Sequence, residues 1–114
     1  MRNQLALFAV LLASASGCAA KPDAAPPAFV DQLVARLQAE PKKNPPGKVW
    51  QYRYRNQVVF YVPPSCCDIP GVLYASDGQV VFSPDGGMTG RGDGKCPDFF
   101  DARTEERLVW SDPR

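Results

Sequence analysis

The clearest structural signal in the chain lies in residues 50–62, which read WQYRYRNQVVFYV. Trp50, Tyr52 and Tyr54 alternate with polar residues, and this period of two is typical of a strand with one buried face. After a tight turn at residues 56–57, the apolar run VVFYV predicts an antiparallel return strand. We expect the three rings to face the core, because a domain this small needs aromatic burial to fold. The alternative is a platform that stacks on a ligand.

Further elements are predicted on both sides of this hairpin. Residues 72–74 and 79–82, separated by a Ser-Asp-Gly turn, predict a second hairpin, and residues 108–110 predict a short final strand. Apolar residues recur at helical spacing from Pro27 to Glu40, so we expect an amphipathic helix there that packs on the sheet, rather than on a partner or a membrane. The sequence predicts an α+β fold: one N-terminal helix on a four- to five-stranded antiparallel sheet, with disulfide-stapled loops.

The start of the chain has the pattern of a secretory signal peptide. Arg2 precedes an apolar run of about eleven residues, which is too short to cross a bilayer. The following Ala15-Ser16-Gly17-Cys18 resembles the lipobox of bacterial lipoproteins, although an ordinary signal peptide with an incidental Cys is the alternative. The resemblance implies cleavage before Cys18 and acylation of its sulfur, which would anchor the protein in a membrane. We expect a signal peptide at 1–17, an acylated Cys and Pro/Ala tether at 18–27, and one domain at 28–114.

Composition and charge exclude several classes of function. The chain contains no His, so Ser-His-Asp and Cys-His catalytic arrangements cannot be built from it alone. Beyond residue 17 it carries 12 basic and 12 acidic side chains, since Arg2 is the one charged residue before that point. This balance provides no net positive charge to attract a nucleic acid. We expect a non-enzymatic protein with no cofactor and no nucleic-acid partner, because no two carboxylates are paired at a recognisable catalytic spacing.

Three cysteines remain for other chemistry when Cys18 is acylated. Cys66 and Cys67 are adjacent, and neighbouring residues of an extended segment face opposite sides, so only one of them can easily reach Cys96. We expect a disulfide between Cys96 and either Cys66 or Cys67, which closes a loop of roughly 30 residues and contributes about 3–4 kcal/mol. The cysteine left over is then a buried thiol, an intermolecular partner or a reactive thiol. A strained disulfide between the adjacent pair is a further alternative.

The segment from Pro84 to Phe100 contains five of the nine glycines and is the main candidate for a binding loop. Glycine at this density indicates positive φ or close backbone approach. Asp85, Asp93 and Asp98 could supply oxygen ligands to Ca²⁺, although their spacing does not fit an EF-hand, and the backbone N–H groups could instead bind an anion. With the Cys-Cys-Asp segment included, the candidate binding residues are Asp68, Asp85, Gly86, Gly87, Arg91, Asp93 and Asp98.

Two blocks of residues resemble a known family. They are Cys66-Cys67-Asp68 and residues 84–98, which read PDGGMTGRGDGKCPD. From Val30 to Trp110 the chain resembles a family of small bacterial cell-envelope lipoproteins classed as a domain of unknown function. This resemblance implies a shared fold and a lipid-anchored protein that faces the periplasm or the cell surface. It implies no activity and no catalytic residue.

These observations lead to a functional hypothesis. We expect a lipid-anchored envelope domain that binds without catalysis, with the Gly-rich loop and the Cys-Cys-Asp loop as its working surface. One alternative is a small envelope inhibitor or assembly factor that presents these loops to a partner protein. Another is a thiol-redox protein that uses whichever of Cys66 or Cys67 is unpaired.

Overall fold

The computed structural model describes residues 25–66 and 68–114. The predicted signal peptide, Cys18 and most of the tether lie outside these residues. No helix in the described ranges is both long enough and apolar enough to cross a bilayer. In chain order the elements are α1 (Ala28–Ala39), β1 (Lys48–Tyr54), β2 (Gln57–Val62), β3 (Val72–Ala75), β4 (Val80–Phe82), α2 (Phe99–Ala102) and β5 (Thr104–Ser111).

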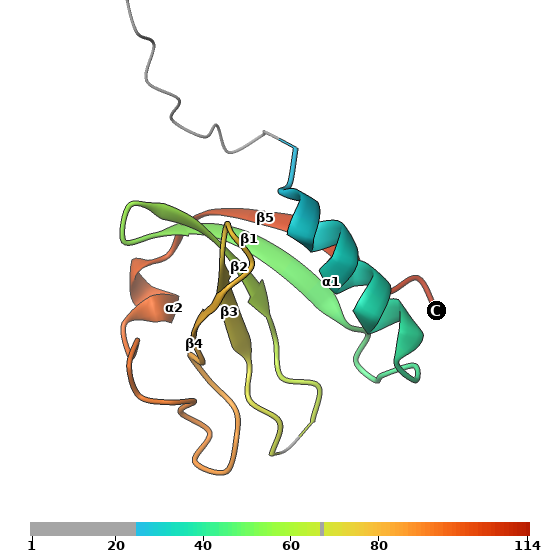
Figure 1. Cartoon of the computed structure of the whole chain (residues 1–114). Helices are drawn as coiled ribbons and strands as arrows, with labels where there is room; N and C mark the ends of the chain where they lie inside the picture. The colour runs from blue at the N-terminus through green and yellow to red at the C-terminus, as the bar shows by residue number, and fades with distance from the viewer. Residues whose placement is uncertain (1–24, 67) are drawn as a thin grey trace, which may run out of the picture.

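The strands form one sheet in the order β4-β3-β2-β1-β5, and every neighbouring pair is antiparallel (Figure 1). The predicted α+β class and antiparallel sheet are confirmed, with five strands. β1 through β4 follow one another as two hairpins, as the alternating pattern and turn residues predict. β5 lies at the edge beside β1, because the chain crosses over the sheet after β4 before it returns.

The hairpin predicted in residues 50–62 is confirmed as β1 and β2. Its register pairs Tyr54 with Gln57, so the two-residue turn is Arg55-Asn56, one residue before the predicted position. Both turn residues have positive φ, 49° and 61°, which is the conformation that matches the twist of a hairpin. The Arg55 guanidinium lies 4.9 Å from the centre of the Tyr54 ring, and this contact stabilises the turn.

Two elements differ from the prediction. The pattern predicts a final strand of three residues, whereas β5 has eight, and its polar first half pairs with β1 through the backbone with a bulge opposite Tyr52. Glu105 has φ 55° at this bulge. An edge strand needs only one neighbour and tolerates charged residues, so its hydrophobic pattern is weak. Helix α2 has four residues, which is too short for a helical period to be visible in the sequence.

Helix α1 covers one face of the sheet (Figure 1). Its Val30 and Leu33 are buried against Val49 of β1 and Phe60 of β2. Phe29 adds an edge-to-face contact with Phe60, with the ring centroids 5.4 Å apart. The expectation that the apolar face of this helix packs on its own sheet is confirmed.

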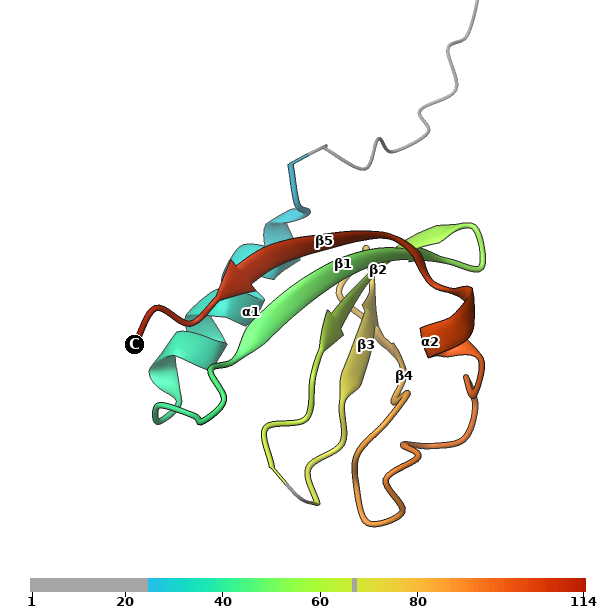
Figure 2. The same cartoon turned by 180° about the vertical axis from the view of Figure 1, so that it is seen from behind.

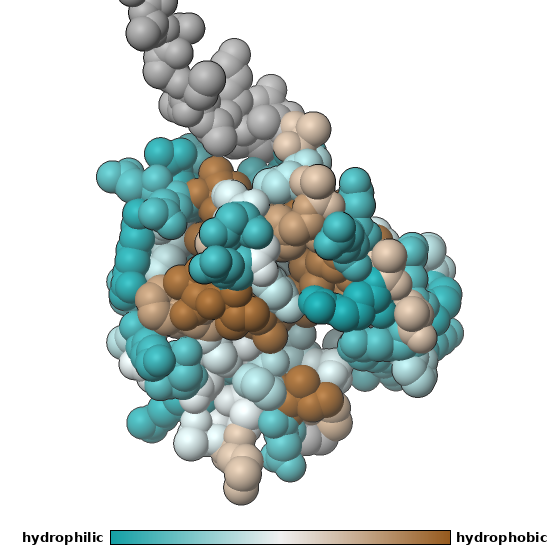
Figure 3. Space-filling model, viewed as in Figure 1, coloured by the Kyte–Doolittle hydropathy of each residue, from teal (hydrophilic) through white to brown (hydrophobic). Residues whose placement is uncertain are grey.

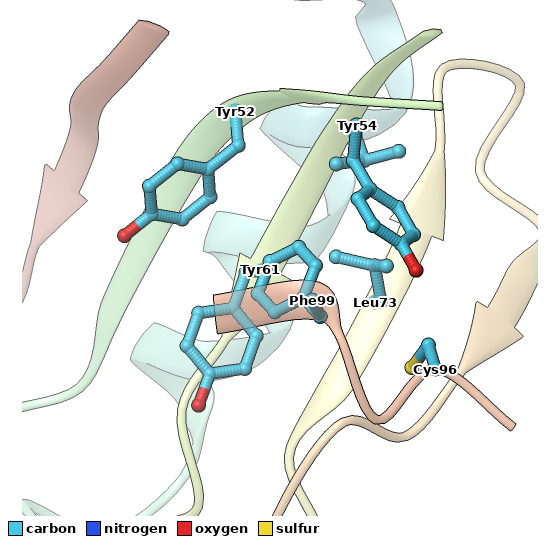
Figure 4. Packing of buried hydrophobic residues seen from close by; sticks show 7 residues of the cluster. Tyr52, Tyr54, Tyr61, Leu73, Cys96 and Phe99 are labelled. Atoms are coloured by element: carbon cyan, nitrogen blue, oxygen red, sulfur yellow. The ribbon is translucent and has the colours of Figure 1, made fainter. Parts of the chain in front are cut away.

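The opposite face of the sheet is covered by the Gly-rich segment and α2, which lie across the sheet from α1 (Figures 1 and 2). Tyr52, Tyr54 and Tyr61 point to this face, and Phe99 of α2 is fully buried among them (Figure 4). Because successive strand residues face opposite sides, each face needs its own cover. The predicted burial of Tyr52 and Tyr54 is confirmed, but the layer that buries them is one that the sequence pattern does not predict.

The predicted disulfide staple is wrong. No disulfide joins two of the described cysteines, and Cys96 is a free thiol with 2% of its surface exposed. Cys66 is disulfide-bonded, but not to Cys96. The physical reason is position: Cys96 packs in the aromatic cluster around Phe99, whereas Cys66 is exposed on the loop between β2 and β3. The covering segment is thus held to the sheet by noncovalent contacts.

Candidate functional site

The two loops that the sequence singles out lie side by side at one end of the sheet. An antiparallel bridge joins Pro70, on the loop between β2 and β3, to Gly86 on the Gly-rich loop. Beside it, the Gly71 N–H donates to the carbonyl of Asp85 at 2.9 Å. The loop that contains Cys66 and Asp68 therefore lies beside the Gly-rich loop.

Backbone hydrogen bonds hold the Gly-rich loop in one folded shape. The Gly92 N–H donates to the carbonyl of Gly86 at 3.1 Å, and the Gly90 N–H donates to the carbonyl of Gly87 at 3.3 Å. Gly92 has φ 62°, and a Cβ at this position would lie 1.9 Å from the carbonyl oxygen of Ser83. The glycine density predicted from the sequence is thus explained by positive φ and close approach.

The exposed Asp93 side chain stabilises the loop by accepting hydrogen bonds from the backbone. One carboxylate oxygen accepts the N–H of Lys95 and the other accepts the N–H of Ser83, both at 2.9 Å. These two hydrogen bonds, the one from Lys95 first, lower the pKa of Asp93 below its ordinary value. Both oxygens accept backbone N–H groups, so Asp93 stabilises the folded shape of the loop.

Three tyrosine hydroxyls on this face of the sheet donate to carboxylates, and two of these hydrogen bonds connect the sheet to its covering segment. The hydroxyl of Tyr61 donates to Asp85 Oδ2 at 2.6 Å, and the hydroxyl of Tyr54 donates to Asp98 Oδ1 at 2.6 Å. The third pair is Tyr52 and Glu106 of β5, at 2.8 Å. Figure 4 shows the three hydroxyls at the edge of the aromatic cluster, where their rings are buried and their oxygens reach outward. A buried tyrosine needs such a partner for its hydroxyl.

This environment suppresses ionisation of the tyrosines. Burial first, and then the hydrogen-bonded carboxylate, raises the pKa of Tyr52 and of Tyr54 to about 12. The same two causes raise the pKa of Tyr61, with Asp85 as its partner. The neutral phenol is the form that can donate to a carboxylate, so the connection persists at physiological pH.

Asp85 is enclosed on both sides of its carboxylate. Its Oδ2 accepts the hydroxyl of Tyr61, and its Oδ1 is buried with no hydrogen-bond partner among the described residues. A Cβ on residue 71 would lie 2.1 Å from this Oδ1, so Gly71 is required for the carboxylate to fit. Asp85 is therefore built into the junction between the loops.

The proposed calcium ligands are not brought together. Asp85 bonds to Tyr61, Asp93 bonds to its own loop, and Asp98 bonds to Tyr54. In the part of the chain that the structure describes, no group of three His, Cys, Asp or Glu side chains is placed to hold a metal ion. Each of the three carboxylates is instead used separately in hydrogen bonding, so the described residues do not support the calcium hypothesis.

The exposed side chains at this end of the molecule are of mixed character. Met88 on the Gly-rich loop has 93% of its surface exposed, Ile69 on the other loop has 54%, and Thr89 and Arg91, which follow Met88, are also exposed. Figure 3 shows an isolated apolar patch at this lower end of the molecule, surrounded by polar surface. We use the name two-loop surface for Asp68, Ile69, Met88, Thr89 and Arg91.

Sequence reasoning finds only part of this surface. Asp68 and Arg91 are among the predicted binding residues and are exposed, whereas Ile69 and Met88 are not among them. The signal that would identify the missing pair is an apolar residue within an otherwise polar and glycine-rich turn, where it has no regular face to bury. Gly86 and Gly87 are half-buried and shape the backbone, with φ 72° and 70°.

The described thiol is poorly suited to redox chemistry. Cys96 is buried, and desolvation first, followed by the charge of Asp93, raises its pKa. A reactive cysteine needs a low pKa and solvent access, and Cys96 has neither. Cys66 is disulfide-bonded and so is not the unpaired thiol of the redox hypothesis, and Cys67 lies outside the described residues.

The fold and the site together define a class of protein: a small α+β domain in which a glycine-rich segment covers the aromatic face of an antiparallel sheet and displays an exposed loop surface. The family model described as Domain of unknown function (DUF6970) matches residues 35–112, so the chain belongs to this family. The matched range includes all five strands and both candidate loops. No curated protein and no solved structure matches the chain.

The close approach at Gly92 gives a stability prediction. Gly92→Ala is expected to destabilise the fold by about 2–4 kcal/mol, because the new Cβ adds a clash with the Ser83 carbonyl to the cost of a left-handed alanine. Gly94→Ala is the matched control, since Gly94 also has positive φ but a Cβ there meets nothing within 4 Å. We expect it to cost about 1–2 kcal/mol. Urea denaturation measures both, and equal losses would contradict the close approach.

The raised tyrosine pKa values predict a loss of stability at high pH. The pKa of Tyr54 is about 12 in the folded state and ordinarily 10.0, so its contribution is complete below pH 10 and disappears as the pH rises toward 12. The free energy of unfolding should therefore fall between about pH 10 and 12, measured by urea denaturation at each pH. Tyr54→Phe should be less stable at neutral pH and show a shallower fall. A variant that follows the wild-type pH dependence would contradict the assignment.

Proposed function

We propose that this protein is a lipid-anchored domain of the bacterial cell envelope that binds a partner protein, without catalysis, through the two-loop surface. The observation that carries the proposal is the position of Met88, almost fully exposed on a loop whose backbone is held by its own hydrogen bonds. Because the loop backbone is already ordered, little backbone freedom is lost when a partner covers this side chain. Methionine is also common at binding surfaces, because its side chain adapts to irregular contacts.

The chemistry of the surface supports a protein partner. Ile69 and Met88 supply apolar area, and Asp68 and Arg91 supply one negative and one positive group beside it. An apolar centre with a polar margin is the usual composition of a protein–protein interface. The carboxylates of Asp85, Asp93 and Asp98 are engaged internally. Recognition is therefore assigned to the exposed side chains of the two-loop surface rather than to these three carboxylates.

The direction of the chain supports the anchored arrangement. Helix α1 begins at the end of the molecule opposite the two loops, as both views show (Figures 1 and 2). A tether from an acylated Cys18 to Ala28 would span up to about 30 Å when extended. It would join the domain at the end remote from the two-loop surface. Such an attachment leaves that surface turned away from the membrane.

The anchor is tested by replacing the cysteine that would carry it. In a bacterial host, Cys18→Ser is expected to move the protein from the membrane fraction to the soluble fraction. Two or three acyl chains give stable membrane attachment, and a protein without acyl chains has no such anchor. Lys21→Ala, which leaves the cysteine in place, is the matched control and should remain in the membrane fraction. Mass spectrometry of the native protein should show acyl groups on Cys18. An unmodified Cys18 at the native N-terminus would contradict the anchor.

The binding surface is tested by site-specific crosslinking in the same host. A photoreactive benzoyl-phenylalanine at position 88 should crosslink to one envelope protein, and Met88→Asp should lower recovery of that protein by about tenfold or more, as for an interface residue of central importance. Position 80 is the matched control, because Val80 is also exposed, at 65%, but lies on β4 away from the two loops. Equal crosslinking from both positions, or none from position 88, would overturn the proposal.

A further inference from the structure

A pocket lies where β1 begins and β2 ends, at the last turn of α1. Its volume is about 260 Å³, which is the size of a molecule with one or two rings. Trp50, Leu37 and Val62 line it, together with two pairs of consecutive prolines, one pair before β1 and one after β2. The pocket shares no residue with the two-loop surface.

The walls of this pocket are stiff and apolar. Proline side chains are fixed to the backbone, and the four prolines belong to the segments 45–46 and 63–64. The Trp50 ring is stacked on Tyr52, with the centroids 6.4 Å apart and 24° between the planes. Such walls favour a flat apolar group, because little freedom is lost when it enters a preformed site.

The charged groups of the pocket are both positive. Lys43 and Lys48 line it, and no acidic side chain is among the described residues that do so. The Lys48 ammonium lies 5.9 Å from the centre of the Trp50 ring, so it is placed above the apolar wall. Lys43 forms an ion pair with Glu40, which leaves Lys48 as the stronger attraction for an anion. Beside the pocket, Lys42 and Arg114 line an adjoining hollow.

We propose that this pocket binds a small aromatic anion. The ring enters beside Trp50 between the proline walls, and the acidic group meets the ammonium of Lys48. Charge complementarity selects the anion over a neutral or cationic ring of the same shape. Partial burial of Lys48 against the indole strengthens this selection, since the charges are partly shielded from bulk water.

Three probes that share one ring system test the charge preference. The full chain, labelled with ¹⁵N, is titrated with 2-naphthoate, with the neutral 2-naphthalenemethanol and with the cationic 2-naphthylmethylamine. The backbone amide signals of Gly47 and Val62 report binding at the pocket, because both residues line it. We expect affinity to decrease in the order anion, neutral ring, cation. Equal affinity of the anion and the cation, or no shift at either amide, would overturn the proposal.

Three substitutions assign the binding to the two groups named. Lys48→Gln is expected to weaken 2-naphthoate binding about two- to fivefold and to leave 2-naphthalenemethanol unchanged. Lys42→Gln is the matched control, since Lys42 lies in the adjoining hollow and should change neither probe. Trp50→Leu should weaken both probes; if this variant does not fold, Lys48→Gln and Lys42→Gln still decide. Equal effects of the two lysine variants would contradict the assigned position of the anion.

Discussion

Phe99 of α2 is fully buried, and its ring lies against Tyr52, Tyr54 and Tyr61 at centroid distances of 5.7, 5.3 and 5.5 Å. These three rings project from the face of the sheet that α1 does not cover. Their hydroxyls must also find acceptors, because a buried phenol without a partner is costly. Two of the acceptors, Asp85 and Asp98, belong to the segment that Phe99 attaches. The insertion of Phe99 therefore fixes the position on the sheet of the segment that carries the exposed loop.

This constraint also explains what the sequence reveals and what it conceals. Periods of two and of 3.6 residues are local, and they suffice for α1, both hairpins and the strand aromatics. The roles of Asp85 and Asp98 depend on partners 24 and 44 residues away in the chain, so no local pattern distinguishes them from solvent-exposed ligands. For the same reason, local patterns do not predict which face of the sheet each aromatic side chain lies on. They also do not predict the single turn of α2. The disulfide prediction for Cys96 fails for the same reason, because its neighbours in the folded chain are aromatic rings and not a second cysteine.

The Gly-rich segment has two tasks that compete for its side chains. As a cover, it contributes Phe99 and Cys96 to the core and the carboxylates of Asp85 and Asp98 to the tyrosines. As a displayed loop, it must leave some side chains unused. Glycine meets both requirements, because a glycine-rich backbone can turn tightly and form hydrogen bonds within the loop without using side chains. The side chains of Met88 and Arg91 at the tip of the loop are consequently exposed and are not part of the core.

The energies involved show why a cross-link is not required to hold this segment. A disulfide closing a loop of roughly 30 residues contributes about 3–4 kcal/mol. Burial of a phenylalanine side chain contributes about 1.5–3 kcal/mol, and each aromatic pair adds about 0.5–1.5 kcal/mol. Phe99 makes three such pairs with the tyrosines, so it alone reaches the same magnitude before any hydrogen bond is included. The attachment of the Gly-rich segment to the sheet then depends on this packing. A substitution in the aromatic face should therefore also shift the exposed loop that the segment carries.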